Sequence, residues 1–121
     1  MSHLRSVLAG TIQQIVVVAA CDELPERVVG IASAALTSDG TREIGVLVED
    51  RYQAQGIGRS MLDCLIGLLD PSEHLSAISS AENRWLLRKL ARYGTVTLHH
   101  EYGLIRARID RPISATDSDQ K

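Results

Sequence analysis

The stretch QAQGIGR, residues 53–59, places two glycines between an apolar run and an amphipathic run. A glycine-rich turn that leads from a strand into a helix presents unpaired backbone N–H groups at the positive end of the helix dipole. Gly56 and Gly58 carry no Cβ, so the main chain there can approach an anion closely. The pattern is neither a P-loop nor the dinucleotide fingerprint GxGxxG. It therefore predicts either a plain strand-to-helix turn or a site that holds a phosphate.

Few other side chains have the type and spacing of a reactive group. Cys21 and Cys64 show neither CxxC spacing nor the density of a disulfide framework, and each lies in an apolar stretch, so both are expected to be small core residues. His99 and His100 are neighbours on an expected strand and point to opposite faces, so at most one can reach any single site. Neither histidine has a partner at metal-ligand spacing, and no metal site is predicted.

Apolar periodicity and turn signals predict the elements that position the glycine loop. Strands are expected at residues 15–20, 28–36, 42–49, 74–80, 95–103 and 104–109. Helices are expected at residues 57–69 and 81–94, each with apolar residues at helical spacing. The Asp-Gly turn at residues 37–41 is typical of a hairpin, so the first three strands are expected to form an antiparallel meander. The predicted order is β-β-β-α-β-α-β-β.

The composition is that of a globular domain, with 121 residues, 45% hydrophobic and 23% charged. A formal charge of −2 and an aromatic content of 3% disfavour a nucleic-acid partner, which needs a basic surface and stacking side chains. No signal-like segment and no apolar run of about 18 residues is found, so a cytoplasmic protein without a membrane partner is expected. We expect one domain over residues 1–110 and a disordered tail over residues 111–121.

The segment VLVEDRYQAQGIGRSML resembles the acetyl-CoA-binding motif of the Gcn5-related N-acetyltransferases (GNAT), in which a strand leads into Q/R-x-x-G-x-G/A. Gln53, Gly56 and Gly58 occupy the three defined positions. The order of elements is also similar to that family over roughly residues 12–110. Within the family, EIGVLVEDRYQAQGIG and LARYGTVTLHHEYGLIRARID look like the catalytic domain of bacterial protein lysine acetyltransferases, including the cyclic-nucleotide-regulated ones. The resemblance implies an α+β fold with a mixed, mostly antiparallel sheet flanked by helices.

The resemblance also implies acetyl-CoA as the acyl donor and assigns residues to it. Backbone groups of Val46, Leu47 and Val48 would align the pantetheine arm, and one of their N–H groups would polarise the thioester carbonyl. Backbone N–H groups of the loop, with Ser60 nearby, would hold the pyrophosphate. The loop residues are Gln53, Ala54, Gln55, Gly56, Ile57, Gly58 and Arg59. Asn83 would contact the cofactor arm, although it could instead cap the second helix.

Glu43 matches the position at which the protein acetyltransferases carry a general base. A lysine amine has a reference pKa of about 10.4 and attacks a thioester only after it loses a proton. The alternative is a solvated charge on the hairpin, paired with Arg42 or a neighbour. Many family members protonate the leaving thiolate with a Tyr where this chain has Leu90, and Tyr93 matches a packing position instead. Leu90 therefore disfavours the small-amine acetyltransferases that depend on that Tyr.

Members of this family normally begin with a strand and two helices that are not expected here, so the fold is expected to be truncated at the N-terminus. The exposed strand edge and the missing wall of the acceptor groove favour a homodimer. Three functions stay open. The first is an N-acetyltransferase that acts on a protein lysine, with Glu43 as the base. The others are a non-catalytic acyl-CoA-binding or regulatory module, and an acetyltransferase for a small-molecule amine.

Overall fold

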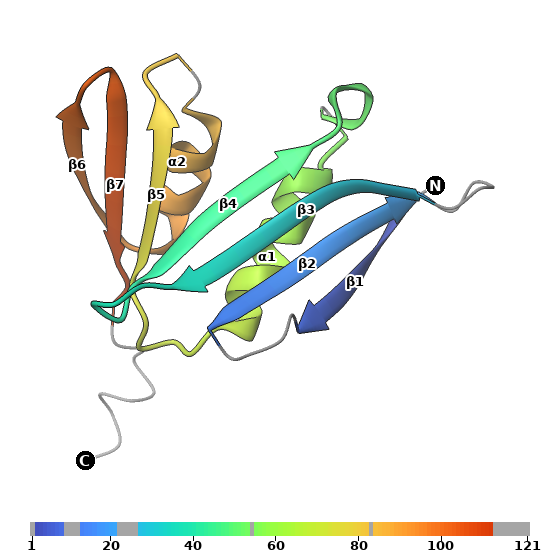
Figure 1. Cartoon of the computed structure of the whole chain (residues 1–121), viewed down its shortest axis with the longest axis horizontal. Helices are drawn as coiled ribbons and strands as arrows, with labels where there is room; N and C mark the ends of the chain where they lie inside the picture. Colours follow the sequence, from blue (N-terminus) through green and yellow to red (C-terminus); the bar gives the residue numbers. More distant parts are fainter. Residues whose placement is uncertain (1, 9–12, 22–26, 54, 83, 113–121) are drawn as a thin grey trace. The chain divides into compact units, whose positions relative to one another are not determined.

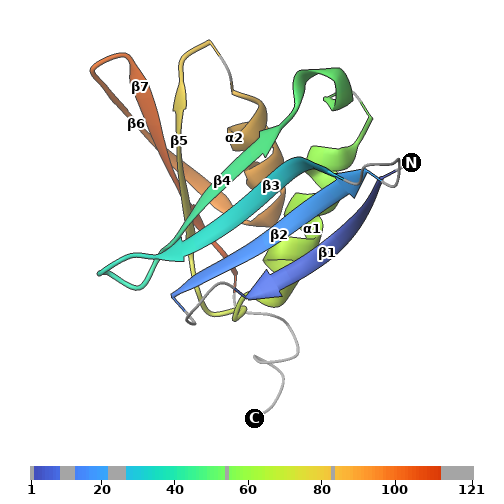
Figure 2. The same cartoon turned by 45° about the vertical axis from the view of Figure 1, so that its right-hand side comes forward.

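The computed structural model describes the backbone of residues 2–8, 13–21, 27–53, 55–82 and 84–112. It describes side chains over the same ranges, apart from residues 2–8 and Cys21. The chain forms two compact units, drawn in Figure 1 and turned by 45° in Figure 2. The first unit is Met1–Leu36 with Ile44–Leu69, and the second is Thr37–Glu43 with Asp70–Lys121.

The first unit is a set of strands covered on one face by a helix. Its elements are β1 (Ser2–Leu8), β2 (Gln14–Cys21), β3 (Arg27–Leu36), most of β4 (Arg42–Val48), the 3₁₀ turn η1 (Asp50–Tyr52) and α1 (Ile57–Leu68). β2 pairs antiparallel with β1 and β3, and the β2–β3 register shifts between Ala19 and Ala20. Small strand residues let α1 pack closely. At Gly30, an added Cβ would lie 2.8 Å from Cε of the buried Met61.

The second unit is a three-stranded antiparallel sheet with a short helix. Its elements are β5 (Leu75–Ser80), α2 (Trp85–Leu90), the 3₁₀ turn η2 (Ala91–Tyr93), β6 (Thr95–Glu101) and β7 (Leu104–Asp110). β7 pairs antiparallel with both β5 and β6. Exposure alternates along β7, which gives the sheet one buried and one open face. The buried residues of the two inner strands and α2 are Leu75, Ala77, Ile105, Ala107, Ile109, Leu87 and Leu90.

The seven strands are hydrogen-bonded in the order β1-β2-β3-β4-β5-β7-β6. The junction of β4 with β5 is parallel and consists of two residue pairs, Arg42↔Leu75 and Glu43↔Ser76. The pairs β1–β2, β2–β3, β5–β7 and β6–β7 are antiparallel. This mixed, mostly antiparallel sheet with its helices confirms the predicted α+β fold class. Within the described ranges, no helix has the length and apolar character needed to cross a membrane.

The structure adds one strand to the predicted order, since β1 pairs with β2 from Ser2↔Cys21 to Leu8↔Ile15. The mixed sequence SHLRSVL has a weak local propensity for a strand. Pairing with the apolar β2 stabilises the strand conformation there. Residues 9–13 alone separate the two strands. A strand therefore precedes β2, but it is joined to β2 without the two helices that the resemblance implies for the family.

The second helix is shorter than predicted, because α2 spans Trp85–Leu90 rather than residues 81–94. The chain tightens into η2 and then passes the end of β7 at Gly94. A Cβ on Gly94 would lie 2.4 Å from the carbonyl oxygen of Asp110, so only a glycine permits this approach. The tail prediction also needs correction at its first residue. Arg111 donates its backbone N–H to His74 Nδ1 over 3.0 Å and its Nε–H to the Glu73 carbonyl over 2.9 Å, while residues 113–121 lie outside the described ranges.

Candidate acyl-CoA site

The glycine loop of the first unit is a tight turn that feeds α1. Gly56 has a φ of +79° and stands immediately before the first residue of α1. This left-handed conformation strains any residue that has a Cβ, although a Cβ at Gly56 would meet no atom within 4 Å. Glycine is therefore required here by the backbone angle rather than by crowding. The backbone angle at Gly56 therefore sets the direction in which α1 begins.

The backbone donors of this loop that have no acceptor within α1 lie in its first turn. Ser60 donates its N–H to the Gly56 carbonyl over 3.0 Å, which is the first hydrogen bond of the helix. The N–H groups of Ile57, Gly58 and Arg59 precede that bond, so helix geometry gives them no acceptor within α1. They also lie at the positive end of the helix dipole. α1 has no acidic residue in its first turn, which keeps this end suited to an anion.

In the earlier part of the predicted phosphate site, backbone N–H groups already make hydrogen bonds within the turn. Gln53 donates its backbone N–H to Asp50 O over 3.2 Å, and Gln55 donates its own to Tyr52 O over 3.4 Å. The Gln53 side-chain Nε2 also donates to Val48 O and to Asp50 Oδ1, each over 3.2 Å. In this structure Gln53 thus ties the end of β4 to η1. Ala54 and Asn83, two more of the predicted site residues, lie outside the described residues.

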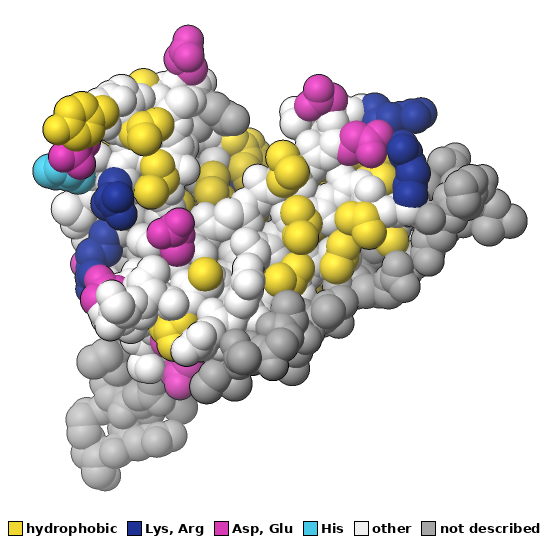
Figure 3. All heavy atoms as spheres, viewed as in Figure 1, with side chains coloured by type: hydrophobic (Ala, Val, Ile, Leu, Met, Phe, Trp, Pro, Cys, Tyr) yellow, Lys and Arg dark blue, Asp and Glu magenta, His cyan; other side chains and the backbone are white. Residues whose placement is uncertain are grey.

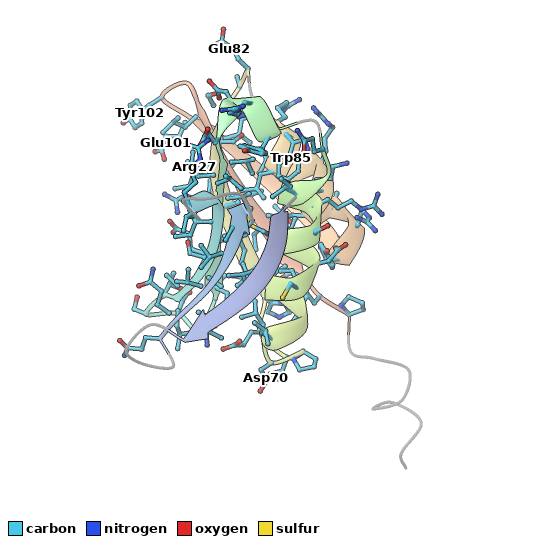
Figure 4. All side chains as sticks on the ribbon, turned by 90° about the vertical axis from the view of Figure 1, so that its right-hand side faces the viewer. Arg27, Asp70, Glu82, Trp85, Glu101 and Tyr102 are labelled. Carbon is cyan, nitrogen blue, oxygen red and sulfur yellow. The ribbon has the colours of Figure 1, made fainter. Side chains whose placement is uncertain are left out.

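An ion pair and a backbone hydrogen bond connect β3 to the residue before the same turn. Arg27 Nη2 lies 2.8 Å from Glu49 Oε1, and Glu49 donates its backbone N–H to the Val29 carbonyl over 2.8 Å. The hydrogen bond with Tyr52, followed by the charge of Glu49, raises the pKa of Arg27 above its ordinary value. Arg27, at the start of β3, is labelled in Figure 4. These contacts connect the start of β3 to the residue that precedes η1.

The β4 residues predicted to align the pantetheine arm differ in exposure. Val46 and Val48 are half-buried, whereas Leu47 points outward with 70% of its surface exposed. The Val48 carbonyl already accepts the Gln53 side chain. An exposed leucine in a strand offers an apolar contact, and the strand backbone offers N–H and C=O groups to an extended ligand.

Glu43, the predicted base, lies in the second unit, on β4 opposite Ser76. Its side chain is exposed, while the adjacent Arg42 is buried and places Nε 3.1 Å from Glu73 Oε1. The alternative in which Glu43 pairs with Arg42 is not supported, because the ion pair of Arg42 is with Glu73 and neighbouring residues on a strand point to opposite faces. Glu43 keeps its carboxylate on the open face of the second unit.

The remaining predicted candidates separate into packing and surface positions. Leu90 is fully buried, so the position at which many relatives carry a Tyr is part of the core here. Tyr93 is half-buried, with Arg92 Cζ 6.0 Å from its ring centre. His99 and His100 are both exposed, and Cys64 is a half-buried free thiol. Within the described ranges, no group of three or more His, Cys, Asp and Glu side chains is placed to hold a metal ion.

Two exposed arginines of β7 were not singled out from the sequence. Arg106 and Arg108 alternate with buried residues in LIRARID and therefore share the open face of the second unit with Glu43. The signal that could have found them is this strict alternation of charged and apolar residues on a predicted strand.

The sequence matches no family model and no curated protein. Its structure, in contrast, resembles several solved acyltransferases. A cAMP-binding acyltransferase from Mycobacterium smegmatis aligns with a TM-score of 0.69 and 19% identity over 98% of this chain and 48% of that protein. A putative acyl-CoA N-acyltransferase from Klebsiella pneumoniae gives 0.66 and 10% over 93% of this chain and 99% of its own. Campylobacter jejuni N-acetyltransferase PseH, solved with acetyl coenzyme A, gives 0.59 and 13% over 84% and 71%.

The chain spans about half the length of the Mycobacterium acyltransferase. All three identities are low, so what the chain shares with these proteins is the arrangement of its elements. In this chain the mixed strand order is accompanied by a left-handed glycine before α1 and by first-turn N–H groups that have no acceptor within α1. These donors fit a phosphate group, which is the part of acetyl-CoA that a helix N-terminus can hold. The chain therefore has the fold of the Gcn5-related N-acetyltransferases.

Proposed function

We propose that this chain is an N-acetyltransferase that takes acetyl-CoA as its donor. The observation that carries the proposal is the turn at Gly56, after which the N–H groups of Ile57, Gly58 and Arg59 have no acceptor within α1, in a fold shared with solved acyltransferases. The loop would hold the pyrophosphate through these N–H groups. The backbone of Val46, Leu47 and Val48 would align the pantetheine arm as an added strand.

The proposed acceptor is a lysine side chain of a protein, and Glu43 is the proposed general base. The Glu43 carboxylate takes a proton from the lysine ammonium, directly or through one water. The nitrogen lone pair then attacks the thioester carbonyl, and a backbone N–H of β4 stabilises the negative charge that develops on oxygen. The new C–N bond forms as the C–S bond breaks, the nitrogen gives up its second proton to solvent as the amide forms, and the thiolate of CoA leaves and is protonated by solvent. The products are an N-acetylated lysine and CoA.

One observation keeps Glu43 available as the base, and another favours this assignment over a small-amine acetyltransferase. Glu43 is exposed, and the ion pair described for Arg42 is with Glu73, so the Glu43 carboxylate faces solvent. The position at which many relatives carry a Tyr that protonates the thiolate is Leu90 here, and this leucine is buried. A CoA thiolate is a good leaving group, and its departure does not require that Tyr.

A second candidate function is a module that binds acyl-CoA without turnover. The short connection at residues 9–13 favours it, because it leaves no room between β1 and β2 for the helices that shape an acceptor groove in the family. The two candidates share the donor site and differ only in the transfer step.

The experiment separates donor binding from transfer. Calorimetry measures acetyl-CoA binding, and labelled acetyl-CoA is then incubated with lysine peptides and with a cell lysate whose acetylated sites are mapped by mass. Glu43→Gln is compared with Glu82→Gln, a control whose side chain projects away from the fold in Figure 4. We expect Glu43→Gln to lower kcat by about 100-fold with little change in acetyl-CoA affinity, whereas Glu82→Gln leaves both unchanged. Binding without transfer to any acceptor would favour the binding module, and undiminished transfer by Glu43→Gln would exclude it as the base.

A further inference from the structure

The open face of the second unit carries an ordered array of side chains. Strand register places Glu43, Ser76 and Arg108 in one row across β4, β5 and β7. The next row places Ile78 beside Arg106 and His99. In a sheet, residues that are paired across strands lie on the same face. Figure 3 shows basic, acidic, histidine and hydrophobic side chains together over these strands.

The two arginines of this face differ in their partners. Arg108 Nε lies 2.9 Å from Asp110 Oδ1, and the charge of Arg108 also helps to lower the pKa of Asp39. Arg108 is therefore largely neutralised by the protein. For Arg106, no ion pair or hydrogen bond to a side chain is found within the described part of the chain, and the residue is exposed. The guanidinium of Arg106 is thus a cation on this face that the fold does not use.

The neighbours of Arg106 on this face are mixed, because β6 contributes His99 and the acidic Glu101 while β5 and β7 contribute apolar side chains. Ile78 is 40% exposed and is its partner on β5, and Leu104 is 48% exposed on the same face two residues before it. Tyr102 stands at the tip of the β6–β7 hairpin with 94% of its surface exposed and a φ of +52°, and it projects outward in Figure 4. An unpaired guanidinium beside exposed aliphatic and aromatic groups favours a ligand with both a carboxylate and an apolar part.

We propose that this face binds a peptide segment that carries an acidic side chain, and that Arg106 recognises its carboxylate. The inference rests on the proposed function in one respect, because it places the acceptor lysine of that segment at Glu43. The geometry of a sheet fixes the spacing. Glu43 and Arg106 are two strands apart and offset by two residues, which separates their Cα atoms by about 12 Å.

This spacing sets the position of the acidic residue relative to the lysine. Side chains as long as Glu43 and Arg106 can close part of this distance, so an ammonium and a carboxylate on the ligand can meet them when they lie roughly 6–9 Å apart. An acidic residue one to three positions from the lysine satisfies this distance. A basic residue at the same position of the peptide would be repelled by Arg106. The face would therefore discriminate between acidic and basic peptides.

The test compares peptides that differ only at the second residue after the lysine, which is Glu, Gln or Lys. The protein is used as wild type and as Arg106→Gln and Arg106→Glu, with Arg88→Gln, on the exposed side of α2, as the matched control. The wild type is expected to favour the Glu peptide over the Gln peptide by about five- to tenfold in kcat/KM. Arg106→Gln removes the preference, Arg106→Glu shifts it to the Lys peptide, and Arg88→Gln leaves it unchanged. The preference also falls as salt rises.

An unchanged preference in Arg106→Gln would overturn the inference. If no peptide is acetylated, the proposed function fails instead, and the face is then tested by the fluorescence anisotropy of the labelled Glu peptide. Binding that is lost in Arg106→Gln and kept in Arg88→Gln supports the inference, while equal binding by all variants contradicts it. A single-stranded oligonucleotide that binds more tightly than the Glu peptide in an Arg106-dependent way would also contradict it, because the face would then select phosphates.

Discussion

Arg42 and Glu73 form a buried ion pair, with 3.1 Å between Nε and Oε1 and only 5% of Arg42 exposed. The Arg42 backbone N–H donates to the His74 carbonyl over 2.9 Å. Together these bonds fix the first residues of β4 against the segment that leads into β5. The next residue, Glu43, is thereby held on the opposite face, opposite Ser76. This ion pair holds Arg42 on the buried face, and the alternation of side chains along the strand places the proposed base on the other face.

Glu73→Gln should destabilise the second unit, because it leaves the buried guanidinium of Arg42 without its carboxylate. Loss of one partner of a buried pair costs about 3 kcal/mol, and the part of Glu73 that is exposed keeps the value at this lower end of the range. Urea unfolding at neutral pH measures it, with Glu82→Gln as the surface control. In the double variant Arg42→Leu, Glu73→Leu, much of the loss should be recovered. A double variant less stable than Glu73→Gln would contradict this account.

Gly94→Ala should be more destabilising than Gly30→Ala, although both glycines are closely approached. At Gly94 the new Cβ would lie 2.4 Å from the Asp110 carbonyl oxygen, a backbone atom that cannot rotate away. At Gly30 the nearest atom is Cε of Met61 at 2.8 Å, the end of a flexible side chain. We expect a loss of about 3 kcal/mol or more for Gly94→Ala and about 1 kcal/mol for Gly30→Ala. Thermal and urea unfolding of the pair test the order, and equal losses would contradict it.

Local patterns in the sequence predict most of the fold. Period-2 and period-3.6 spacing locate β2 to β7 and α1, and the Gly-x-Gly pattern locates the turn before α1. Contacts between distant residues were not accessible in this way. The sequence separates Arg42 from Glu73 by 31 positions, and Gly94 approaches Asp110 only after β6 and β7 have paired. The shortness of α2 and the presence of β1 follow from such tertiary contacts, which override local propensity.

The candidate site was predictable in part for the same reason. Gly56 could be recognised because a glycine between a strand and a helix has a local cause, the left-handed backbone angle. Which N–H groups stay free depends on η1, where the N–H groups of Gln53 and Gln55 are occupied by Asp50 and Tyr52. The orientation of Glu43 depends on the burial of its neighbour. Neither can be read from residue types alone.

Acid should weaken the fold partly through Asp39 and Asp70. The Thr37 hydroxyl, followed by Thr41, lowers the pKa of Asp39 below 3.8, and the backbone N–H of Ser72 lowers that of Asp70. A carboxyl whose folded pKa lies below its unfolded value adds stability above the unfolded pKa, and this stability is lost as the pH falls through the folded pKa. The free energy of unfolding should therefore fall on acidification below about pH 4.

Asp39→Asn should flatten this pH dependence, since the titrating group is removed. Thr37→Val is the matched variant, because it keeps the carboxylate and removes the hydroxyl that stabilises its charge. Its dependence on pH in the acid range should also be weaker than that of the wild type. Urea unfolding between roughly pH 2 and pH 7 gives the slopes. Parallel curves for the three proteins would show that Asp39 contributes nothing to acid unfolding.

Ser60→Glu should move stability and donor binding in opposite directions. Ser60 is exposed in the first turn of α1, and its N–H makes the first hydrogen bond of the helix. A negative charge there favours the helix dipole by about 0.3–1 kcal/mol, so the free energy of unfolding should rise slightly. The same charge would repel a pyrophosphate bound to the N–H groups of Ile57 to Arg59, and Kd for acetyl-CoA should rise about tenfold, less so at high salt. Ser60→Gln, similar in size and uncharged, should change neither quantity much. A Ser60→Glu protein that binds acetyl-CoA as tightly as Ser60→Gln would show that the phosphates do not bind at the start of α1. A negative charge close to bound phosphates would weaken their binding at low salt.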